Sequence, residues 1–509
     1  MVRQHRAHRR RQEQGSRSFV DGEPTAAYAC GGGHRALGRA HREGVRRRVH
    51  GGAGRLDGSR GARGAPTRAR GRRGAVVAGL HELRLVFQLR RTRRRFRSVH
   101  SRHHEREPTM TTVNIDETGG TAIPSLKVRR RAVLEGRRLG SAKLQSEPEP
   151  RREFYFILLI AGVFVAMGLV MVLSASSIVS VNSGGSAFTM FRKQLLWAFF
   201  GVLVAAGTYR MPYRVWQRLH RPMLVVVLVL NALPFTGLGV TVNGAHAWVE
   251  MGPVRFQPSE LLKFALVIFL TNVLGRRQRE LTNMKRTFVP AVFALIVAVG
   301  IVLAQRDLGA AVVLAGIAFI VLFMAGTPVR WIIASASTAL LVGGTYIAAS
   351  ASRRSRWTAF FDIEGNKEHT AYQVWQSMLS ISNGGFLGVG PGAGTSKWGY
   401  VPLAHSDFIF TVIAEEFGFI GSSLVIGGFF ALTLLGFLVA MKAPDYSGAL
   451  LAAGITVWFA LQATINIGGV VGVMPVTGLT LPLISYGGSS LLISLAAIGL
   501  LLNVARQLR

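Results

Sequence analysis

Long apolar runs separated by short polar segments fill the chain from Phe154 to its end. Ten of these runs have about the 20 residues that an α-helix needs to cross a hydrocarbon core of about 30 Å. They lie at 154–178, 194–209, 222–238, 257–275, 287–305, 309–327, 330–350, 406–441, 446–472 and 484–505. The pattern therefore predicts an all-α polytopic membrane protein with about ten transmembrane helices in one domain, residues 153–509.

One long polar segment interrupts this pattern between the seventh and eighth predicted helices, at 351–405. It carries several titratable side chains between two apolar runs, namely Asp362, Glu364, Glu368, His369, Lys397 and His405. Membrane proteins keep such groups outside the hydrocarbon core because a charge there is costly, and loops commonly carry function. We therefore expect the chemistry of this protein in the loop, at the bilayer surface.

Basic residues in the short loops predict the orientation of the helices. They fall on one predicted side, at 210–221, 276–286, Arg330, Lys442 and Arg506. Since cytoplasmic loops are enriched in Lys and Arg, this side is predicted to be cytoplasmic, together with both ends of the helical domain. The 351–405 loop then faces outward, as does segment 240–258, whose Gly and Pro content suits a re-entrant or surface loop.

Residues 1–109 differ in composition from the rest of the chain. They hold 28 of the 60 basic residues, all of them Arg, and are rich in Gly, Ala and His. Three interpretations stay open: a disordered Arg-rich arm that binds nucleic acid or anionic lipid, a targeting peptide that lacks an apolar core, or a mis-assigned start with initiation at Met110. Residues 110–152 form a polar tail of mixed charge, predicted to be cytoplasmic.

Composition adds little about partners. The formal net charge of +35 and the hydrophobic content of 49% conflict until the Arg-rich start is separated from the apolar remainder. The charge of the whole chain is therefore a poor guide to what the membrane domain binds, and no nucleic acid partner is expected for that domain. The single cysteine, Cys30, excludes an internal disulfide framework and a thiolate metal cluster.

Two charged pairs lie at membrane depth. Glu260 and Lys263 are three residues apart at the start of the fourth predicted helix, which places them on one helical face. Arg306 and Asp307 lie between the fifth and sixth helices. Charges at such depth are usually buried against partners or line a wet cavity. Both a structural ion pair and a role in substrate binding remain open for each pair.

The segment 473–492 interrupts an apolar run with Pro475, Pro482 and two adjacent glycines. It also carries small hydroxyl residues, including Ser485 and Ser489. This pattern is typical of a broken helix that lines a cavity. Close helix packing through small residues explains it as well.

Six motifs in the apolar region resemble the SEDS family, the shape, elongation, division and sporulation proteins FtsW, RodA and SpoVE. They are QPSELLK at 257–263, QRDLG at 305–309, YQVWQS at 372–377, GGFLGVGPG at 384–392, LAHSDFIFTVIAEEFGFIG at 403–421 and GLTLPLISYGGSSLL at 478–492. The resemblance runs over about 154–509. The AHSDFIF and AEE block and the last motif are most similar to the division member, FtsW.

This resemblance implies a peptidoglycan glycosyltransferase. Its substrate would be lipid II, a disaccharide-pentapeptide on undecaprenyl pyrophosphate, and the 4-hydroxyl of an acceptor sugar would attack the anomeric carbon of the donor. A carboxylate would take the hydroxyl proton. Positive charge, from a side chain or a divalent cation such as Mg or Mn with unknown ligands, would stabilise the departing pyrophosphate.

The chain departs from the family pattern at the expected catalytic position. The family resembles F-x-[DN]-P-x-x-D-P-x-G-x-G-Y-Q, and without gaps FFDIEGNKEHTAYQ places Asn366 at the second acidic position. An amide cannot act as a general base. Three explanations stay open: a shifted alignment in which Asp362 serves, replacement by Glu368 or Glu364, or a catalytically impaired scaffold. Of the three carboxylates we favour Asp362, then Glu368, then Glu364.

The remaining candidates are substrate-binding residues. Lys397 is the first candidate for contact with the pyrophosphate, with Arg306 and Lys263 as deeper alternatives. The other candidates are Glu260, Asp307, His405, Asp407, Ser485 and Ser489. His405, Ser406 and Asp407 are adjacent, but adjacency does not make a catalytic triad. Asp407 also suits the start of the eighth helix, where a carboxylate stabilises the helix dipole.

The resemblance also implies a place and partners. It predicts a multi-pass protein of the bacterial cytoplasmic membrane, located at the division septum, that acts with a class B penicillin-binding transpeptidase and other divisome proteins. The alternatives are a lipid II flippase, a non-enzymatic division scaffold and a RodA-like elongation polymerase. A flippase needs cavity charges that are reachable from both sides but no loop carboxylate.

Overall fold

The computed structural model describes residues 152–242, 244–252 and 254–508. The predictions for the Arg-rich segment 1–109 and for the tail 110–152, except its last residue, lie outside the described residues. Ten apolar helices follow in chain order: α4 (Arg152–Asn182), α5 (Thr189–Arg210), α7 (His220–Leu230), α8 (Pro258–Arg276), α9 (Val289–Ala304), α10 (Leu308–Met324), α11 (Val329–Ala348), α14 (Ile409–Lys442), α15 (Tyr446–Val470) and α16 (Gly488–Arg506).

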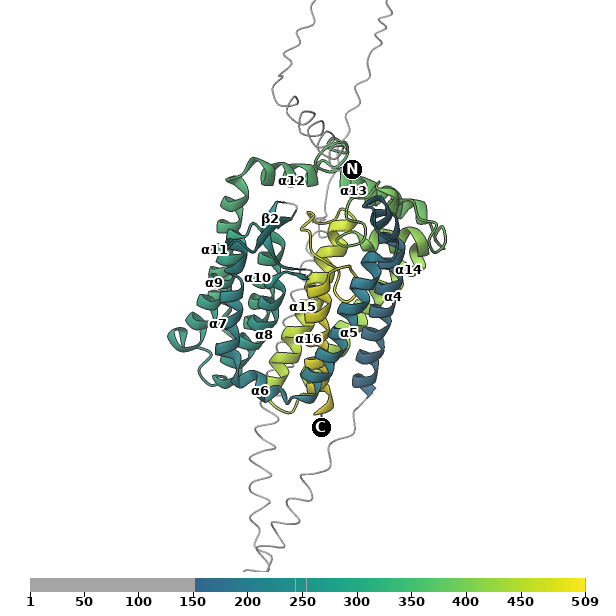
Figure 1. Ribbon diagram of the computed structural model, residues 1–509. Helices are drawn as coiled ribbons and strands as arrows, with labels where there is room; N and C mark the ends of the chain where they lie inside the picture. Colours follow the sequence, from purple (N-terminus) through teal and green to yellow (C-terminus); the bar gives the residue numbers. More distant parts are fainter. Residues whose placement is uncertain (1–151, 243, 253, 509) are drawn as a thin grey trace, which may run out of the picture. The chain divides into compact units, whose positions relative to one another are not determined.

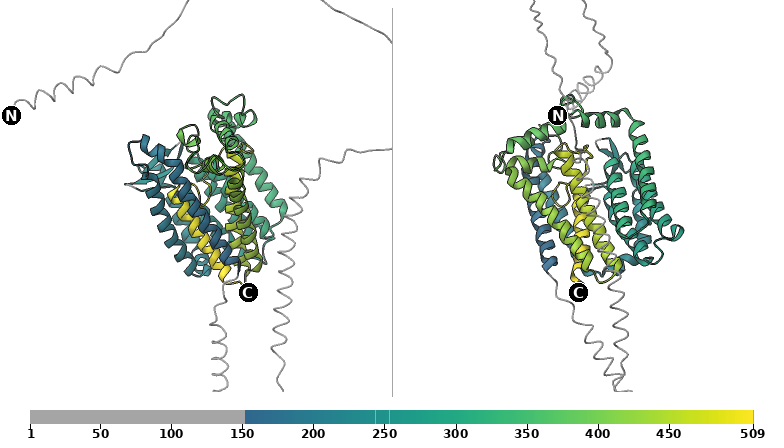
Figure 2. Two further views of the ribbon diagram at one scale, coloured as in Figure 1. Left: turned by 90° about the vertical axis from the view of Figure 1, so that its right-hand side faces the viewer. Right: turned by 180° about the vertical axis from the view of Figure 1, so that it is seen from behind.

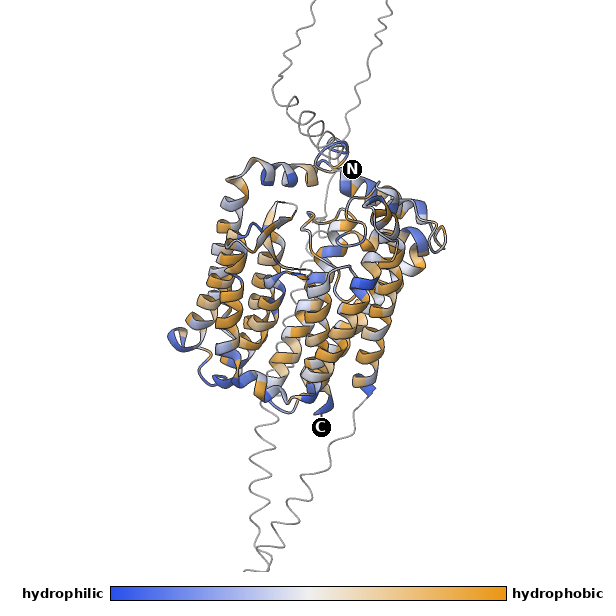
Figure 3. Cartoon of the chain, in the orientation of Figure 1, coloured by the Kyte–Doolittle hydropathy of each residue, from blue (hydrophilic) through white to orange (hydrophobic). Residues whose placement is uncertain are grey.

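The membrane-spanning character of this architecture is confirmed. Eight helical segments in the described part of the chain are long and apolar enough to cross a bilayer, and His220–Phe235 and Leu308–Met324 are two shorter apolar ones. Together they coincide with the ten predicted runs, although the number of crossings stays a prediction. Hydrophobic residues cover the helices, and hydrophilic ones gather towards the ends of the bundle (Figure 3).

Three helices form the centre of the bundle. In their most apolar windows, 94% of α8, 83% of α15 and 89% of α16 is buried, whereas only 6% of α11 is. A helix that is apolar on all sides is stable only when other helices or lipid surround it. The many small residues of α15 and α16 let their neighbours approach closely. The peripheral helices present their apolar side chains outward, as a lipid environment requires.

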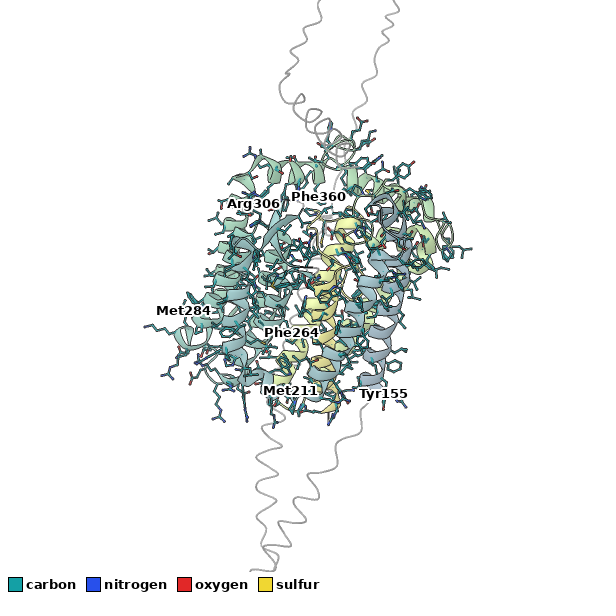
Figure 4. All side chains as sticks on the ribbon, in the orientation of Figure 1. Tyr155, Met211, Phe264, Met284, Arg306 and Phe360 are labelled. Carbon is teal, nitrogen blue, oxygen red and sulfur yellow. The ribbon has the colours of Figure 1, made fainter. Side chains whose placement is uncertain are left out.

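Ion pairs and ring contacts define one end of the bundle, which we call the base face. Lys442 pairs with Glu153, the Arg506 guanidinium lies 5.5 Å from the centroid of the Tyr209 ring, and the short helix α6 (Tyr213–Arg218) lies there too. Both ends of the described chain are therefore at the base face (Figure 1). Tyr155 and Met211 mark it in Figure 4.

The predicted outward loop lies at the other end, which we call the loop face and which Arg306 and Phe360 mark in Figure 4. Much of the loop is helical: α12 (Ala351–Phe361), α13 (Tyr372–Gly384) and the 3-10 turn η3 (Ser396–Trp398). Figures 1 and 2 show α12 and α13 across the ends of the long helices. The helices form because 351–361 and 372–384 contain no proline and few glycines.

A glycine breaks α14 where the loop packs against it. Gly418 has φ 63°, and a Cβ there would lie 2.4 Å from the backbone nitrogen of Gly388. Only glycine combines this backbone conformation with so close an approach of a second chain segment. The glycine-rich segment after α13 is thus anchored to α14, as the backbone bond from Phe419 N to Gly385 O (2.9 Å) also indicates.

Segment 240–258, predicted to be a re-entrant or surface loop, instead forms most of a small antiparallel sheet. Its strands β1 (Gly239–Val242), β2 (Ala245–Met251) and β3 (Val254–Phe256) lie in the order β1-β2-β3, with Gly239 opposite Val249 and Val249 opposite Phe256. Ala247 and Val249 of β2 are buried while their neighbours are less so, which is the alternation of a strand with one packed face. The bond from His246 N to Gln305 O (2.8 Å) ties the sheet to the end of α9.

Candidate active site

A buried polar cluster lies at the start of α8. Lys263, with 0% of its surface exposed, lies 2.8 Å from Glu260 and donates to the Gln462 side chain at 2.7 Å. Trp458 also donates to Gln462 (2.8 Å), and its ring lies 5.4 Å from Lys263 Nζ. The ion pair predicted from the i,i+3 spacing is therefore present. Its charges are stable at this depth because each has a partner of opposite charge or a dipole.

Asp307 joins this cluster from the other side. It is the N-cap of α10, where its carboxylate accepts hydrogen bonds from Ala310 N and Gln257 Nε2, both at 2.9 Å. Burial raises the pKa of Asp307, and the Ala310 N–H and the charge of Lys263 oppose the rise. The Arg306 side chain is exposed, and its backbone lies in the left-handed region with φ 64°. Asp307 therefore turns inward to α8 and α10, while Arg306 points away from the core.

Asp407 lies two residues before α14, in a narrow cavity of about 10 Å³ with Asn466, Thr477 and Gly478 among its lining residues. Burial raises the pKa of Asp407 to about 6, a hydrogen bond from Ser406 opposes the rise, and the negative charge of Asp307 adds to it. A Cβ on Gly478 would lie 3.6 Å from Asp407 Oδ2, and the same segment continues to Thr480, whose carbonyl accepts from Gln462 Nε2 at 2.9 Å. We call Gln257, Glu260, Lys263, Asp307, Asp407 and Gln462 the central polar cluster.

The segment between α15 and α16 is non-helical and packs inside the bundle. Ser485 Oγ donates to Ser406 O (2.6 Å) and accepts from Leu481 N (2.8 Å), while Ser489 Oγ accepts from Gln257 N (3.2 Å). Irregular backbone at membrane depth is stable only when such bonds replace those of a helix. The hydrogen bonds of Ser485 and Ser489 therefore stabilise the irregular segment that forms the wall of the central polar cluster.

His405 stands beside this wall. Its ring lies 5.6 Å from that of Tyr486, and its carbonyl accepts from Tyr486 N at 3.0 Å. Burial lowers the pKa of His405. The imidazole is thus favoured in its neutral form, packed at the edge of the central polar cluster.

The predicted catalytic carboxylates lie apart from this cluster, in residues 362–371 at the loop face, which we call the acidic loop segment. Asp362, Glu364 and Glu368 are exposed. Asp362 caps a turn by accepting from Gly365 N at 2.9 Å, and Asn366 donates its side-chain N–H to Asp362 O at 2.8 Å. Asn366 therefore organises the turn that presents Asp362.

The acidic loop segment rests on the α15–α16 connection. A Cβ on Gly472 would lie 3.3 Å from Ile363 Cδ1 and 3.4 Å from Val374 Cγ1. Because Gly472 belongs to the irregular segment that continues to Thr477 and Gly478, Ile363, which lies between Asp362 and Glu364 in the chain, packs on the same connection that walls the central polar cluster.

Lys397 lies in a second buried network, which we call the loop clamp. Its Nζ lies 3.0 Å from Glu416 Oε1 and donates to Ser174 Oγ (3.1 Å) and Gly392 O (2.5 Å). Only 6% of Lys397 and 1% of Glu416 is exposed. The ammonium group is thus fully used by internal partners that hold the glycine-rich segment against α4 and α14.

Glu415 is the other half of the loop clamp. It accepts from Thr395 N (2.9 Å), Thr395 Oγ1 (2.7 Å) and Ser396 N (3.0 Å). Four polar residues that were not predicted site residues also hold contacts here: Ser174, Gln257, Gln462 and Asn466. An isolated amide in an apolar run, such as Gln462 in WFALQATIN, was the available signal.

A divalent cation is predicted to accompany the substrate pyrophosphate. The described residues contain no group of three or more His, Cys, Asp or Glu side chains that could hold a metal ion. Mg²⁺ proteins often supply only one or two carboxylates, with substrate phosphates and water completing the shell. A cation held mainly by substrate phosphates and water would not require such a group of side chains.

The fold and this site define a polytopic helical membrane protein with exposed carboxylates above a buried polar centre. Comparison with known proteins makes the assignment more specific. The chain belongs to the cell cycle protein family of FtsW, RodA and SpoVE, whose sequence profile matches residues 154–509. The membership predicted from the six motifs is thereby confirmed.

Several relatives are similar over most of their length. The probable peptidoglycan glycosyltransferase FtsW of Trichlorobacter lovleyi is 39% identical over 354 residues, which cover 69% of this chain and 93% of the relative. The stage V sporulation protein E of Bacillus subtilis is 35% identical over 356 residues, 69% of this chain and 97% of the relative.

Solved structures share the fold. A structure described as the structural coordination of polymerization and crosslinking by a peptidoglycan synthase complex matches with a TM-score of 0.58 and 30% identity, covering 69% of this chain and 97% of that one. The rod shape determining protein RodA of Thermus thermophilus matches with a TM-score of 0.52 and 29% identity, covering 69% and 95%.

Proposed function

We propose that this protein is a peptidoglycan glycosyltransferase that polymerises lipid II for septal wall synthesis. The observation that carries the proposal is that Ile363, between the exposed carboxylates of Asp362 and Glu364, packs on the same α15–α16 connection that walls a buried polar cluster. Relatives that carry this activity in their names support it, and FtsW relatives favour division over elongation.

The reaction needs one proton acceptor and one stabiliser of negative charge. The acceptor 4-hydroxyl loses its proton to a carboxylate as its oxygen bonds to the donor anomeric carbon. The bond from that carbon to the pyrophosphate oxygen breaks, and undecaprenyl pyrophosphate leaves with the electron pair. The products are a glycan longer by one disaccharide and the lipid pyrophosphate.

Asp362 is the proposed general base. Its carboxylate is exposed and fixed by Gly365 N, so it is both accessible and oriented. Glu368 and Glu364 are exposed as well, but among the described residues no hydrogen bond fixes either carboxylate. Asn366 is proposed to stabilise the turn that holds Asp362, through the hydrogen bond from its side chain to Asp362 O.

Arg306 is the proposed contact for the pyrophosphate. Lys397 is committed to Glu416, Ser174 and Gly392, and Lys263 to Glu260 and Gln462. Arg306 is exposed at the loop face next to Asp307. A guanidinium group suits the bidentate contact that a phosphate offers.

The same proposal includes the orientation in the membrane, the partners and a cation. Basic residues near both described ends, such as Arg506, favour a cytoplasmic base face and an outward loop face in the bacterial cytoplasmic membrane. Glycan polymerisation has to be followed by cross-linking, so a class B penicillin-binding transpeptidase and other septal proteins are the proposed partners. A divalent cation such as Mg or Mn is proposed to accompany the pyrophosphate.

One observation favours a second candidate. Because Asn366 occupies the position where the family pattern has its second acidic residue, a non-enzymatic division scaffold is the alternative. A scaffold needs the fold and its partner surfaces but no carboxylate in the acidic loop segment.

The deciding experiment is lipid II polymerisation by the purified full-length chain with its transpeptidase and Mg²⁺. The wild type is compared with Asp362→Asn, Glu368→Gln and Glu364→Gln, of which Glu364→Gln is the matched control. We expect glycan chains from the wild type and the control, and a loss of about 10²- to 10⁴-fold in rate for Asp362→Asn.

Other outcomes have defined meanings. Loss only in Glu368→Gln or Glu364→Gln would move the base to that residue and keep the enzyme. No glycan from the wild type, where a control polymerase is active, would refute the catalytic proposal. Lipid II transfer across vesicles without polymerisation would then favour a flippase, and neither activity would favour the scaffold.

A further inference from the structure

A second cavity opens at the base face, away from the acidic loop segment. It has a volume of about 280 Å³ and lies between α6, the end of α8 and the start of α15. This is close to the lower limit of small-molecule sites, which hold about 300–1,000 Å³. The glycosyl transfer proposed above uses no residue of this cavity.

Cationic side chains dominate its lining. Arg214, Arg218 and Arg276 contribute three positive charges and Asp445 one negative charge, which leaves +2. Asp445 is already engaged, because its carboxylate accepts from Tyr213 OH (2.8 Å) and Gly448 N (2.6 Å) and lies 3.7 Å from Arg214. The remaining guanidinium groups therefore favour an anion.

A buried donor lines the same cavity without a partner. Gln217 is 6% exposed, and among the described residues its Nε2 has no hydrogen-bond partner. Buried side-chain N–H groups are almost always paired, so an unpaired one calls for an acceptor that the protein does not supply. A ligand oxygen in the cavity would satisfy it.

The arginine at the end of α8 is held in place from behind. Arg276 Nε donates to Asn272 Oδ1 (2.9 Å), and Asn272 in turn contacts His220 Nδ1 at 2.7 Å. These contacts hold the Nε edge of the Arg276 guanidinium group. The α15 N-terminus, at Asp445 and Ser447, adds the positive end of its helix dipole to the cavity wall.

We propose that this cavity binds a phosphate group, with Arg218, Arg276 and Gln217 as the donors to its oxygens. Arginine forks match phosphate oxygens in pairs. Basic pockets between transmembrane helices at their ends bind the head groups of anionic phospholipids, and the position of this cavity at the helix ends suits such a head group. A free phosphate or a soluble phosphate ester would offer the same chemistry.

The test measures phosphate-dependent stabilisation of the full-length chain in nanodiscs. One arm raises the fraction of phosphatidylglycerol in phosphatidylcholine, and the other adds inorganic phosphate to phosphatidylcholine discs. We expect phosphatidylglycerol to raise the unfolding temperature of the wild type. Arg218→Gln with Arg276→Gln should weaken the apparent affinity at least about tenfold, as expected when a charge-assisted contact is lost.

Two further variants keep the test decisive. Gln217→Leu should weaken binding several-fold without altering the unfolding temperature in pure phosphatidylcholine. Arg279→Gln, an exposed arginine outside the cavity lining, is the matched control and should bind as the wild type does. A response to phosphatidylglycerol alone identifies a head group, and a response to inorganic phosphate identifies a soluble source. No response in either arm, or an equal response in all variants, would overturn the proposal.

Discussion

The central polar cluster and the acidic loop segment carry charge in opposite ways. In the cluster, Lys263 is fully buried and paired with Glu260, and Asp307 accepts two fixed hydrogen bonds. In the loop segment, Glu364 and Glu368 are exposed, and Asp362 is fixed only by its turn. We therefore expect that loss of a charge in the cluster destabilises the fold. The loop segment is an accessible surface whose loss should affect chemistry alone.

The largest expected effect tests the cluster. Lys263→Met leaves Glu260 buried without its cation, and removing one partner of a buried pair costs about 3–5 kcal/mol. The unfolding temperature in detergent should fall clearly, and Glu260→Gln added to Lys263→Met should recover much of the loss. Glu368→Gln in the loop segment serves as the control and should change stability by less than about 0.5 kcal/mol. Equal effects in both regions would contradict the comparison.

The next largest expected effect is the pH dependence of stability that Asp407 causes. The pKa of Asp407 rises from its usual 3.8 to about 6 on folding. The folded state then binds the Asp407 proton more tightly than the unfolded state does. Protonation of Asp407 therefore stabilises the fold fully below about pH 4, and this contribution is lost as the pH rises through about 6. The shift of about two units corresponds to about 3 kcal/mol.

Replacement of that carboxyl makes the pH effect measurable. Asp407→Asn should unfold at a higher temperature than the wild type at pH 7.5, and the difference should shrink towards pH 4. Unfolding scans of the two proteins across this range give the comparison. A difference that grows as the pH falls would have the wrong sign.

A smaller effect tests the geometry of the loop segment. Asp362→Asn with Asn366→Asp moves the carboxylate to the position of the family pattern. If the acidic loop segment needs only an accessible base over the α15–α16 connection, this double variant should regain at least about tenfold in lipid II polymerisation over Asp362→Asn alone, about 1.4 kcal/mol. Asp362→Asn with Glu364→Gln is the matched control. No recovery would mean that the Asp362 turn itself is required.

The smallest expected effect concerns Arg306 at the boundary of the two regions. Arg306→Gln removes an exposed charge, and such contacts are worth about 0.2–1 kcal/mol. The KM for lipid II should rise about two- to fivefold, while kcat and the unfolding temperature stay unchanged. A changed unfolding temperature would place Arg306 with the cluster instead.

Much of the fold could be predicted from the sequence, but not the small sheet. The ten apolar runs mark the helices because crossing a bilayer demands length and apolarity, which are local properties. The strands β1–β3 could not be predicted because short strands depend on pairing between neighbours. The Gly and Pro content of this segment is equally typical of a loop.

The membrane character and the family follow from the sequence alone, which also names most of the charged candidate residues. Only the tertiary structure decided which of them meet: Lys263 with Gln462, 199 positions apart, and Ser174 with Glu416, 242 positions apart. It placed Lys397 in the loop clamp instead of on an open surface and gathered Arg218 and Arg276 around one cavity. The physical reason is that a buried charge takes whichever partner packing brings within about 3 Å, and sequence spacing fixes such distances only within a single helix.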